Sequence, residues 1–141
     1  MCDGDHCFTV GALPSRWRQV QQEGLEIGFF DDLANAAIQG NSTCRDDVDL
    51  APLSSLTSQL LLGYTARTIR SESLVPLDRR EALHTIVDAR LDGVPIVLDL
   101  YVTKRDNCIY DLSLAAPPLS YARAQADFTS FVTGFAGGRA L

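Results

Sequence analysis

Residues 83–102 read LHTIVDARLDGVPIVLDLYV, two runs of alternating apolar and polar residues joined by Asp92-Gly93. An Asp-Gly pair between such runs is typical of a two-residue type I′ turn, because both turn positions need a positive φ. This turn places Leu91 opposite Val94, and the same register then pairs the residues further along both strands. We therefore expect a long antiparallel hairpin whose apolar residues gather on one face.

The next turn, Arg105-Asp106-Asn107, favours a three-residue loop with Asn107 in the left-handed conformation. This loop length would extend the apolar face of the hairpin by three residues of the following strand: Tyr110, Leu112 and Leu114. A two-residue turn would instead bury Asp111 and Ser113, and the cost of removing polar groups from water argues against it.

Four further strands and two helices complete the expected architecture. The strands span 17–23, 25–30, 36–44 and 68–77. Apolar residues at spacings of three and four predict an amphipathic helix over 50–64. A last helix, capped by Ser120, has an apolar stripe of Tyr121, Ala124, Phe128, Phe131, Val132 and Phe135.

The predicted fold is α+β, with a mostly antiparallel sheet of about seven strands and two helices packed on one face. The other face of the sheet is expected to be open. We expect a flexible leader over 1–11, a single domain over 12–136 and a tail over 137–141.

Composition excludes several classes of function. The chain has 141 residues, and its 12 Lys and Arg against 18 Asp and Glu give a formal net charge of −6. Nucleic acid is a poor partner for such a chain, because phosphate binding needs clustered basic residues. No apolar run approaches the roughly 18 residues of a membrane-spanning helix, so we expect no transmembrane segment.

The four cysteines indicate a disulfide framework and an exported protein. Of the three connectivities, we expect Cys44 with Cys108 and Cys2 with Cys7. The start of the chain lacks the features of a signal peptide, so a periplasmic or outer-membrane-anchored protein would have lost its signal. Cys2 could then lie next to a lipoprotein cleavage site. A cytoplasmic protein with free thiols is the alternative.

Two pairs of stretches resemble the PsbP-like superfamily. They are LPSRWRQV (13–20) followed by IGFF (27–30), and YDLSL (110–114) followed by FTSFVTGF (128–135). The families of this superfamily are related to the photosystem extrinsic protein P, and small bacterial envelope lipoproteins are similar to them. The resemblance spans roughly residues 12–136 and implies an antiparallel sheet packed with helices, used as a non-enzymatic binding or assembly module. No catalytic motif and no functional residue is transferred from it.

The candidate site lies on the open face of the predicted sheet. There the two hairpin registers set three polar side chains in one row, and apolar residues add to the same face. The candidates for binding a partner are His84, Ile86, Val97, Tyr101, Ile109 and Asp111. The partner would be an unknown envelope protein or a second copy in a homodimer.

Three other functions are compatible with parts of the sequence. The His-Tyr-Asp row could shuttle a proton in a His-dependent enzyme, but the sequence has neither a G-x-S-x-G elbow nor a Gly-rich loop before a helix. A carrier of a small apolar ligand would need a cavity lined by residues such as Leu60, Tyr64, Leu98 and Phe131.

The third alternative is a metal site at the N-terminus. Cys2, Asp3, Asp5, His6 and Cys7 are residue types that zinc accepts. No second Cys or His pair follows at zinc-finger spacing. We therefore expect no metal, no cofactor and no enzymatic activity.

Overall fold

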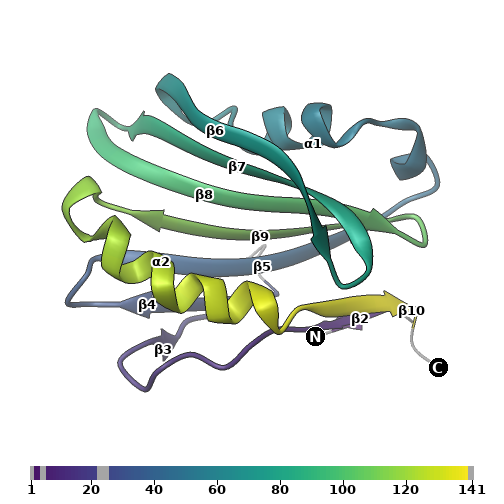
Figure 1. Ribbon diagram of the computed structural model, residues 1–141, viewed down its shortest axis with the longest axis horizontal. Coiled ribbons are helices and arrows are strands. Elements are labelled where there is room, and N and C mark those ends of the chain that lie inside the picture. The colour runs from purple at the N-terminus through teal and green to yellow at the C-terminus, as the bar shows by residue number, and fades with distance from the viewer. Residues whose placement is uncertain (1, 4–5, 22–25, 140–141) are drawn as a thin grey trace.

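A main sheet of seven antiparallel strands forms most of this computed structural model, which describes residues 2–3, 6–21 and 26–139 (Figure 1). Its strands are β3 (Arg18–Gln19), β4 (Ile27–Asp31), β5 (Ala36–Cys44), β6 (Thr65–Leu77), β7 (Arg80–Leu91), β8 (Val94–Arg105) and β9 (Cys108–Ala116). Across the sheet their order is β3-β4-β5-β9-β8-β7-β6. The expected α+β class is confirmed, with residues 22–25 of the predicted strands outside the described residues.

Two helices flank the sheet on opposite faces, and not on one face as we expected. Helix α2 (Pro118–Thr133) packs on β5, β8 and β9 and crosses the sheet in Figure 1. Helix α1 (Leu53–Leu60), which follows the 3-10 turn η1 (Val48–Leu50), packs on β7 and β8. Val97 belongs to the core on the α2 side and Leu98 to the core on the α1 side. Consecutive strand residues point to opposite faces, so both faces are covered in part.

The first hairpin has the predicted register. Asp92 and Gly93 have φ of 51° and 81°, as a type I′ turn requires. Leu91 lies opposite Val94, and the pairing continues in step along β7 and β8.

The second hairpin is one residue out of step with our prediction. Asp106 and Asn107, with φ of 53° and 62°, form a two-residue turn that places Arg105 opposite Cys108. The apolar residues of β9 therefore lie on the α2 side of the sheet and are fully buried there: Tyr110, Leu112 and Leu114. Asp111 and Ser113 face the α1 side. Our prediction failed because it assumed a single covered face, whereas α1 covers the second face only in part and leaves these polar groups partly exposed.

Helix α2 begins at Pro118, before the predicted cap. The Ser120 hydroxyl donates instead to the Ala34 carbonyl at 2.6 Å, which ties the helix to the turn between β4 and β5. The apolar stripe of α2 is buried as predicted from its spacing: Tyr121, Ala124, Phe128, Phe131 and Val132.

The two ends of the chain pair with each other, which corrects the expected leader and tail. β1 (Cys2–Asp3), β2 (His6–Thr9) and β10 (Ala136–Arg139) form a small sheet in the order β1-β2-β10. Phe8 is only 1% exposed and packs on Tyr110 and Phe135. The described part of the leader and of the tail therefore belongs to the domain.

A buried arginine joins the two sheets. Arg105 donates to the Asp78 carboxylate at 2.6 Å and to the Gly137 carbonyl at 3.0 Å, and lies 5.6 Å from the centre of the Phe135 ring. The same carboxylate accepts the Gly137 N–H at 3.0 Å. Removing one partner from such a buried pair costs stability because the other charge is left unpaired.

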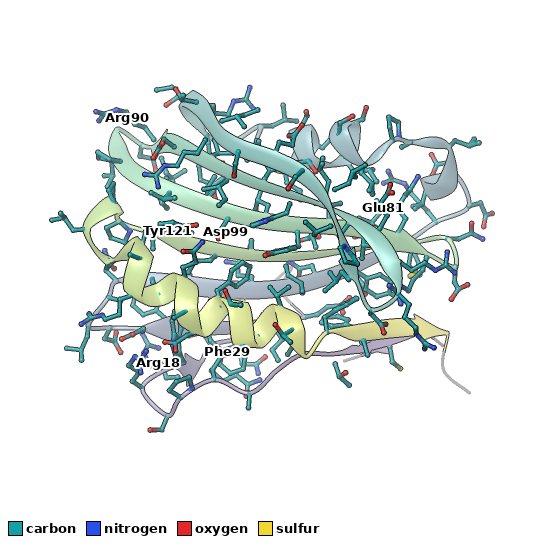
Figure 2. All side chains as sticks on the ribbon, in the orientation of Figure 1. Arg18, Phe29, Glu81, Arg90, Asp99 and Tyr121 are labelled. Carbon is teal, nitrogen blue, oxygen red and sulfur yellow. A yellow bond between two sulfur atoms is a disulfide. The ribbon has the colours of Figure 1, made fainter. Side chains whose placement is uncertain are left out.

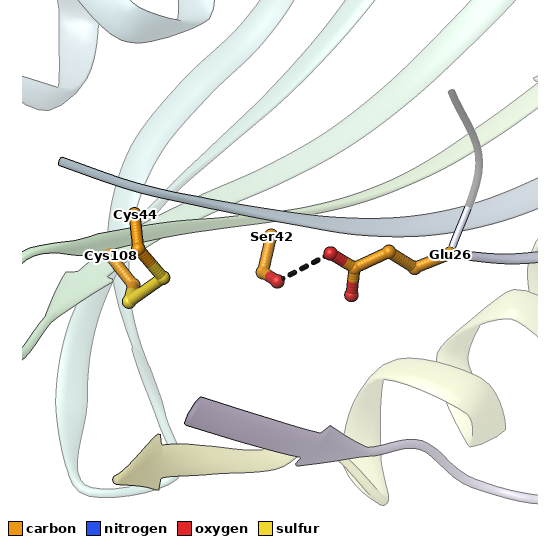
Figure 3. The surroundings of a disulfide bond; sticks show 4 residues. All are labelled: Glu26, Ser42, Cys44 and Cys108. Atoms are coloured by element: carbon orange, nitrogen blue, oxygen red, sulfur yellow. Dashed lines mark hydrogen bonds between the residues drawn. A yellow bond between two sulfur atoms is a disulfide. The ribbon is translucent and has the colours of Figure 1, made fainter. Parts of the chain in front are cut away.

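A disulfide joins Cys44 and Cys108, which lie directly opposite each other on β5 and β9 (Figure 3). The Ser42 hydroxyl, on the same side of β5, donates to Glu26 at 2.7 Å. Cys7 is also disulfide-bonded. Its backbone lies opposite Cys2, whose side chain is outside the described residues.

Candidate functional site

The predicted polar row is divided between the two faces of the sheet. His84 and Tyr101 remain neighbours, with their rings stacked 4.0 Å apart at an angle of 8°. They lie on the α2 side, where the Tyr101 ring also packs on Phe128 at 5.8 Å. Asp111 lies opposite Val102 on the α1 side. The face that we expected to be open at His84 and Tyr101 is therefore covered in part by α2.

Asp99 takes the place that we assigned to Asp111. Its carboxylate is 2% exposed, lies 2.6 Å from His84 Nε2 and accepts the Tyr121 hydroxyl at 2.8 Å. Gln125 donates to that hydroxyl at 2.9 Å. Figure 2 shows Tyr121 on α2 beside Asp99 on the sheet. These bonds satisfy a carboxylate that would otherwise be costly to bury.

The two tyrosines beside Asp99 keep their protons at neutral pH. Burial, with a smaller contribution from the charge of Asp99, raises the pKa of Tyr101 to about 12. Burial and the hydrogen bond to Asp99 raise the pKa of Tyr121 as well. Arg70 lies 5.6 Å from the centre of the Tyr121 ring and pairs with Asp88 at 2.6 Å. These side chains bond chiefly to one another, so the cluster fastens α2 to the sheet.

Sequence reasoning missed the Asp99 cluster, although one signal was present. Asp99 is a lone carboxylate between apolar residues of a strand, a pattern that indicates a specific polar contact when both neighbours are buried. Its partners Tyr121 and Gln125 lie 22 and 26 residues further along the chain. No local pattern relates them to Asp99.

The six partner-binding candidates do not form one surface. Val97 is fully buried, and Ile86 packs against the core on the α2 side together with Tyr101. Ile109 and Asp111 are partly buried on the other face.

A cavity of about 140 Å³ lies between the end of α1 and the sheet, and we call it the α1 cavity. Its lining includes three of the four residues expected for a carrier, Leu60, Tyr64 and Leu98. The fourth, Phe131, is buried on the opposite face with α2. The remaining lining residues are Ala37, Gln39, Asn41, Leu61, Leu100, Asp111, Ser113 and Ala115. The α1 cavity is thus partly polar, unlike the apolar cavity that we expected.

Asp111 is the charged group of the α1 cavity. Burial, supplemented by the negative charge of Glu26, raises its pKa to about 6, against the opposing effect of a hydrogen bond with Asn41. Burial also raises the pKa of Tyr64. The cavity therefore holds a carboxylate whose charged form is poorly solvated.

The edge strand β6 presents a second candidate surface. Residues 65–74 are all exposed, including Ile69 at 56% and Leu74 at 57%. A surface concavity of about 380 Å³ continues from the end of β6 into the next turn and is lined by Leu74, Val75, Pro76, Arg79, Arg80 and Glu81. We define the β6 surface as Ile69, Leu74, Arg79 and Arg80.

No group of three or more His, Cys, Asp or Glu side chains among the described residues is arranged to hold a metal ion. No helix in this part of the chain has the length and apolar character needed to cross a membrane.

Comparisons with known proteins identify the fold. No family model and no curated protein matches the sequence. Cyanobacterial PsbP (CyanoP) from Synechocystis is 11% identical, with a TM-score of 0.65, and the match covers 96% of both chains. LpqN, involved in cell envelope biogenesis of Mycobacterium tuberculosis, is 10% identical at a TM-score of 0.68, over 95% of this chain and 84% of LpqN. A Bacteroides thetaiotaomicron protein is 15% identical at a TM-score of 0.61, over 94% of this chain and 45% of its own. The PsbP-like fold is confirmed.

The pKa of Asp111 predicts a specific pH dependence of stability. The folded value of about 6 lies above the unfolded value of about 3.9. The native state therefore binds more protons within this window, and the free energy of unfolding falls as the pH rises through it. We expect Asp111→Asn to be more stable than the parent above pH 6.5 by about 1–2 kcal/mol, and equally stable near pH 4.

Urea denaturation at pH 4, 5, 6 and 7.5 measures this difference. Asp92→Asn, at an exposed turn residue, removes the same charge and should give a difference that does not change with pH. A constant difference between the parent and Asp111→Asn across this range would contradict the assignment.

Proposed function

We propose that this chain is a non-catalytic protein-binding module outside the cytoplasm, and that its β6 surface binds an extended acidic segment of a partner protein. One observation carries the proposal: a long exposed edge strand runs into a surface concavity lined by two arginines. Edge strands bind extended peptides by adding them as a further strand.

The exposed side chains of β6 provide apolar contacts along such a segment. An edge strand has N–H and C=O groups along one side without partners in the sheet. Ile69 and Leu74 are both more than half exposed. A peptide pairing with β6 would therefore gain main-chain hydrogen bonds and bury both side chains.

Charge selects the kind of partner. Arg79 and Arg80 form no ion pair with a described residue and line the concavity together with Glu81, so two positive charges stand against one negative charge there. The chain as a whole is acidic, with a net charge of −6. An acidic segment would be attracted to this local positive charge, whereas a second acidic copy would be repelled at long range. This argument favours a different protein over the homodimer.

Irregularities in β6 restrict what can pair with it. Its register with β7 shifts between Thr65 and Thr68 and again between Ile69 and Ser71, and Ala66 has a φ of 51°. Such bulges protect exposed edges from indiscriminate pairing. A partner with a matching shape would still bind.

Two observations support the location outside the cytoplasm. Stable disulfides such as Cys44–Cys108 are typical of oxidising compartments. LpqN, which shares the fold, is involved in cell envelope biogenesis. The proposal extends to a periplasmic or outer-membrane-anchored lipoprotein with its anchor near Cys2.

The alternatives receive less support. The His84 ring stacks on Tyr101, and its Nε2 lies 2.6 Å from the buried Asp99, so the protein itself occupies one ring face and this nitrogen. The α1 cavity, at about 140 Å³ and with a carboxylate, two amides and a hydroxyl in its lining, is smaller and more polar than a carrier of an apolar ligand needs. We therefore place protein binding before carriage of an apolar ligand and before enzymatic activity.

Thiol blocking in intact cells tests the compartment. Cells are treated with a permeant alkylating reagent before lysis, and the mass of the protein is then measured. We expect Cys44 and Cys108 to be unmodified because they are joined in a disulfide. Alkylation of all four cysteines in native cells would contradict the proposed location.

Site-specific cross-linking tests the β6 surface. A photo-cross-linking residue at position 74 should capture one discrete partner from the native envelope, because Leu74 lies where β6 meets the concavity. The same residue at position 119 is the matched control, since Leu119 is fully exposed on α2. Equal capture from both positions, or a product of twice the chain mass, would contradict the proposal.

Charge reversal then tests recognition of the captured partner. Arg79→Glu with Arg80→Glu should weaken its binding at least tenfold, because two attractions become repulsions. Arg18→Glu with Arg123→Glu changes the charge equally at exposed sites on β3, at the opposite edge of the sheet, and on α2, and should have little effect. Equal weakening by both double variants would show that only net charge matters.

A further inference from the structure

The α1 cavity has an apolar end and a polar end. Leu60, Leu61 and Tyr64, from the end of α1 and the turn after it, face Leu98 and Leu100 of β8 across the apolar end. At the polar end β5 and β9 set pairs of side chains opposite each other: Gln39 with Ser113, and Asn41 with Asp111. Such a lining suits a ligand with an alkyl chain and one polar head.

The polar groups at this end are incompletely satisfied by the protein. Within the described residues, Asp111 has a hydrogen bond with Asn41 but forms no ion pair. The Gln39 amide and the Ser113 hydroxyl have no hydrogen bond to another residue in this same part of the chain. All three therefore have bonding capacity to offer to a bound group.

The negative charge at the polar end of the α1 cavity favours a cationic ligand. Glu26 lies close enough to Asp111 for its charge to disfavour a second carboxylate. Lys104 lies on the same face of β8, but its ammonium group donates a hydrogen bond to the Ala51 carbonyl at 2.5 Å and does not pair with Asp111. A partly buried carboxylate in such a site is stabilised most by a positively charged hydrogen-bond donor.

We propose that the α1 cavity binds the ammonium head and short alkyl chain of a primary amine. The head would donate to Asp111, Gln39 and Ser113, and the chain would pack on the leucines and Tyr64. The volume of about 140 Å³ is that of roughly five water-sized groups, which suits a chain of about four carbons with its head. This site shares no residue with the β6 surface. A negative result at one of them therefore leaves the proposal for the other unaffected.

Titration with n-butylammonium chloride, followed by amide NMR shifts at constant ionic strength, tests the site. We expect saturable shifts at residues lining the α1 cavity, such as Gln39, Leu61 and Ser113. n-Butanol supplies the chain without the charge, and methylammonium supplies the charge without the chain. Each should bind at least tenfold more weakly, because each engages only one end of the cavity.

Variants separate the site from general attraction of cations to an acidic protein. Asp111→Asn should weaken n-butylammonium at least tenfold and leave n-butanol unchanged. Asp92→Asn removes an equal charge at an exposed turn and should leave both affinities unchanged. The proposal is overturned if n-butanol binds as well as n-butylammonium, if Asp111→Asn has no effect, or if the shifts lie outside the cavity.

The source of the amine is distinguished by a second probe. N-acetyl-lysine methylamide has the same four-carbon chain and ammonium head on a peptide unit. If it binds as n-butylammonium does, the ligand is a lysine side chain of another protein. If only n-butylammonium binds, the ligand is a free small amine. Both results support the site, and failure of both probes overturns it.

Discussion

The two-residue turn at Asp106-Asn107 is the constraint on which the rest of the structure depends. Side chains alternate along a strand, so a shift of one residue in the pairing of β8 with β9 moves every side chain of β9 to the other face. The observed turn places Tyr110, Leu112 and Leu114 on the α2 side of the sheet, where they are almost completely buried. It leaves Asp111 and Ser113 on the side of α1.

The chemistry of the two faces follows from this division. On the α2 side, Asp99 is surrounded by donors that hold the helix in place. On the α1 side, a short helix covers only part of the sheet, and a carboxylate, two amides and a hydroxyl remain around a small cavity. The first face is closed by Asp99 and its donors, and the second keeps the polar groups that we propose a ligand binds. Partner binding through β6 depends on the edge of the sheet and the side chains beside it, and uses neither the Asp99 cluster nor the α1 cavity.

Local sequence was sufficient for some elements and not for others. The Asp92-Gly93 hairpin was predictable because both the turn residues and the alternating runs indicate the same register. The Asp106-Asn107 turn suits loops of two or three residues, so the choice depended on the cost of burying Asp111. That cost is set by which helix covers which face, and this is a long-range property. Asp99 was also beyond local reasoning, because its partners Tyr121 and Gln125 lie on α2, which follows the second hairpin and a further turn. The apolar spacing predicted three residues that line the α1 cavity, Leu60, Tyr64 and Leu98. The polar end was not predictable, because it depends on the pairing of β8 with β9, which we placed one residue out of step.

Nuclear Overhauser effects across β8 and β9 test the register most directly. We predict contacts from the methyl groups of Leu112 and Leu114 to the ring protons of Tyr101 and of the aromatic residues of α2, since Tyr101 lies opposite Leu112 on the α2 side. Contacts from these methyl groups to those of Leu98 and Leu100 would place β9 one residue out of step, and would contradict both the Asp99 cluster and the α1 cavity.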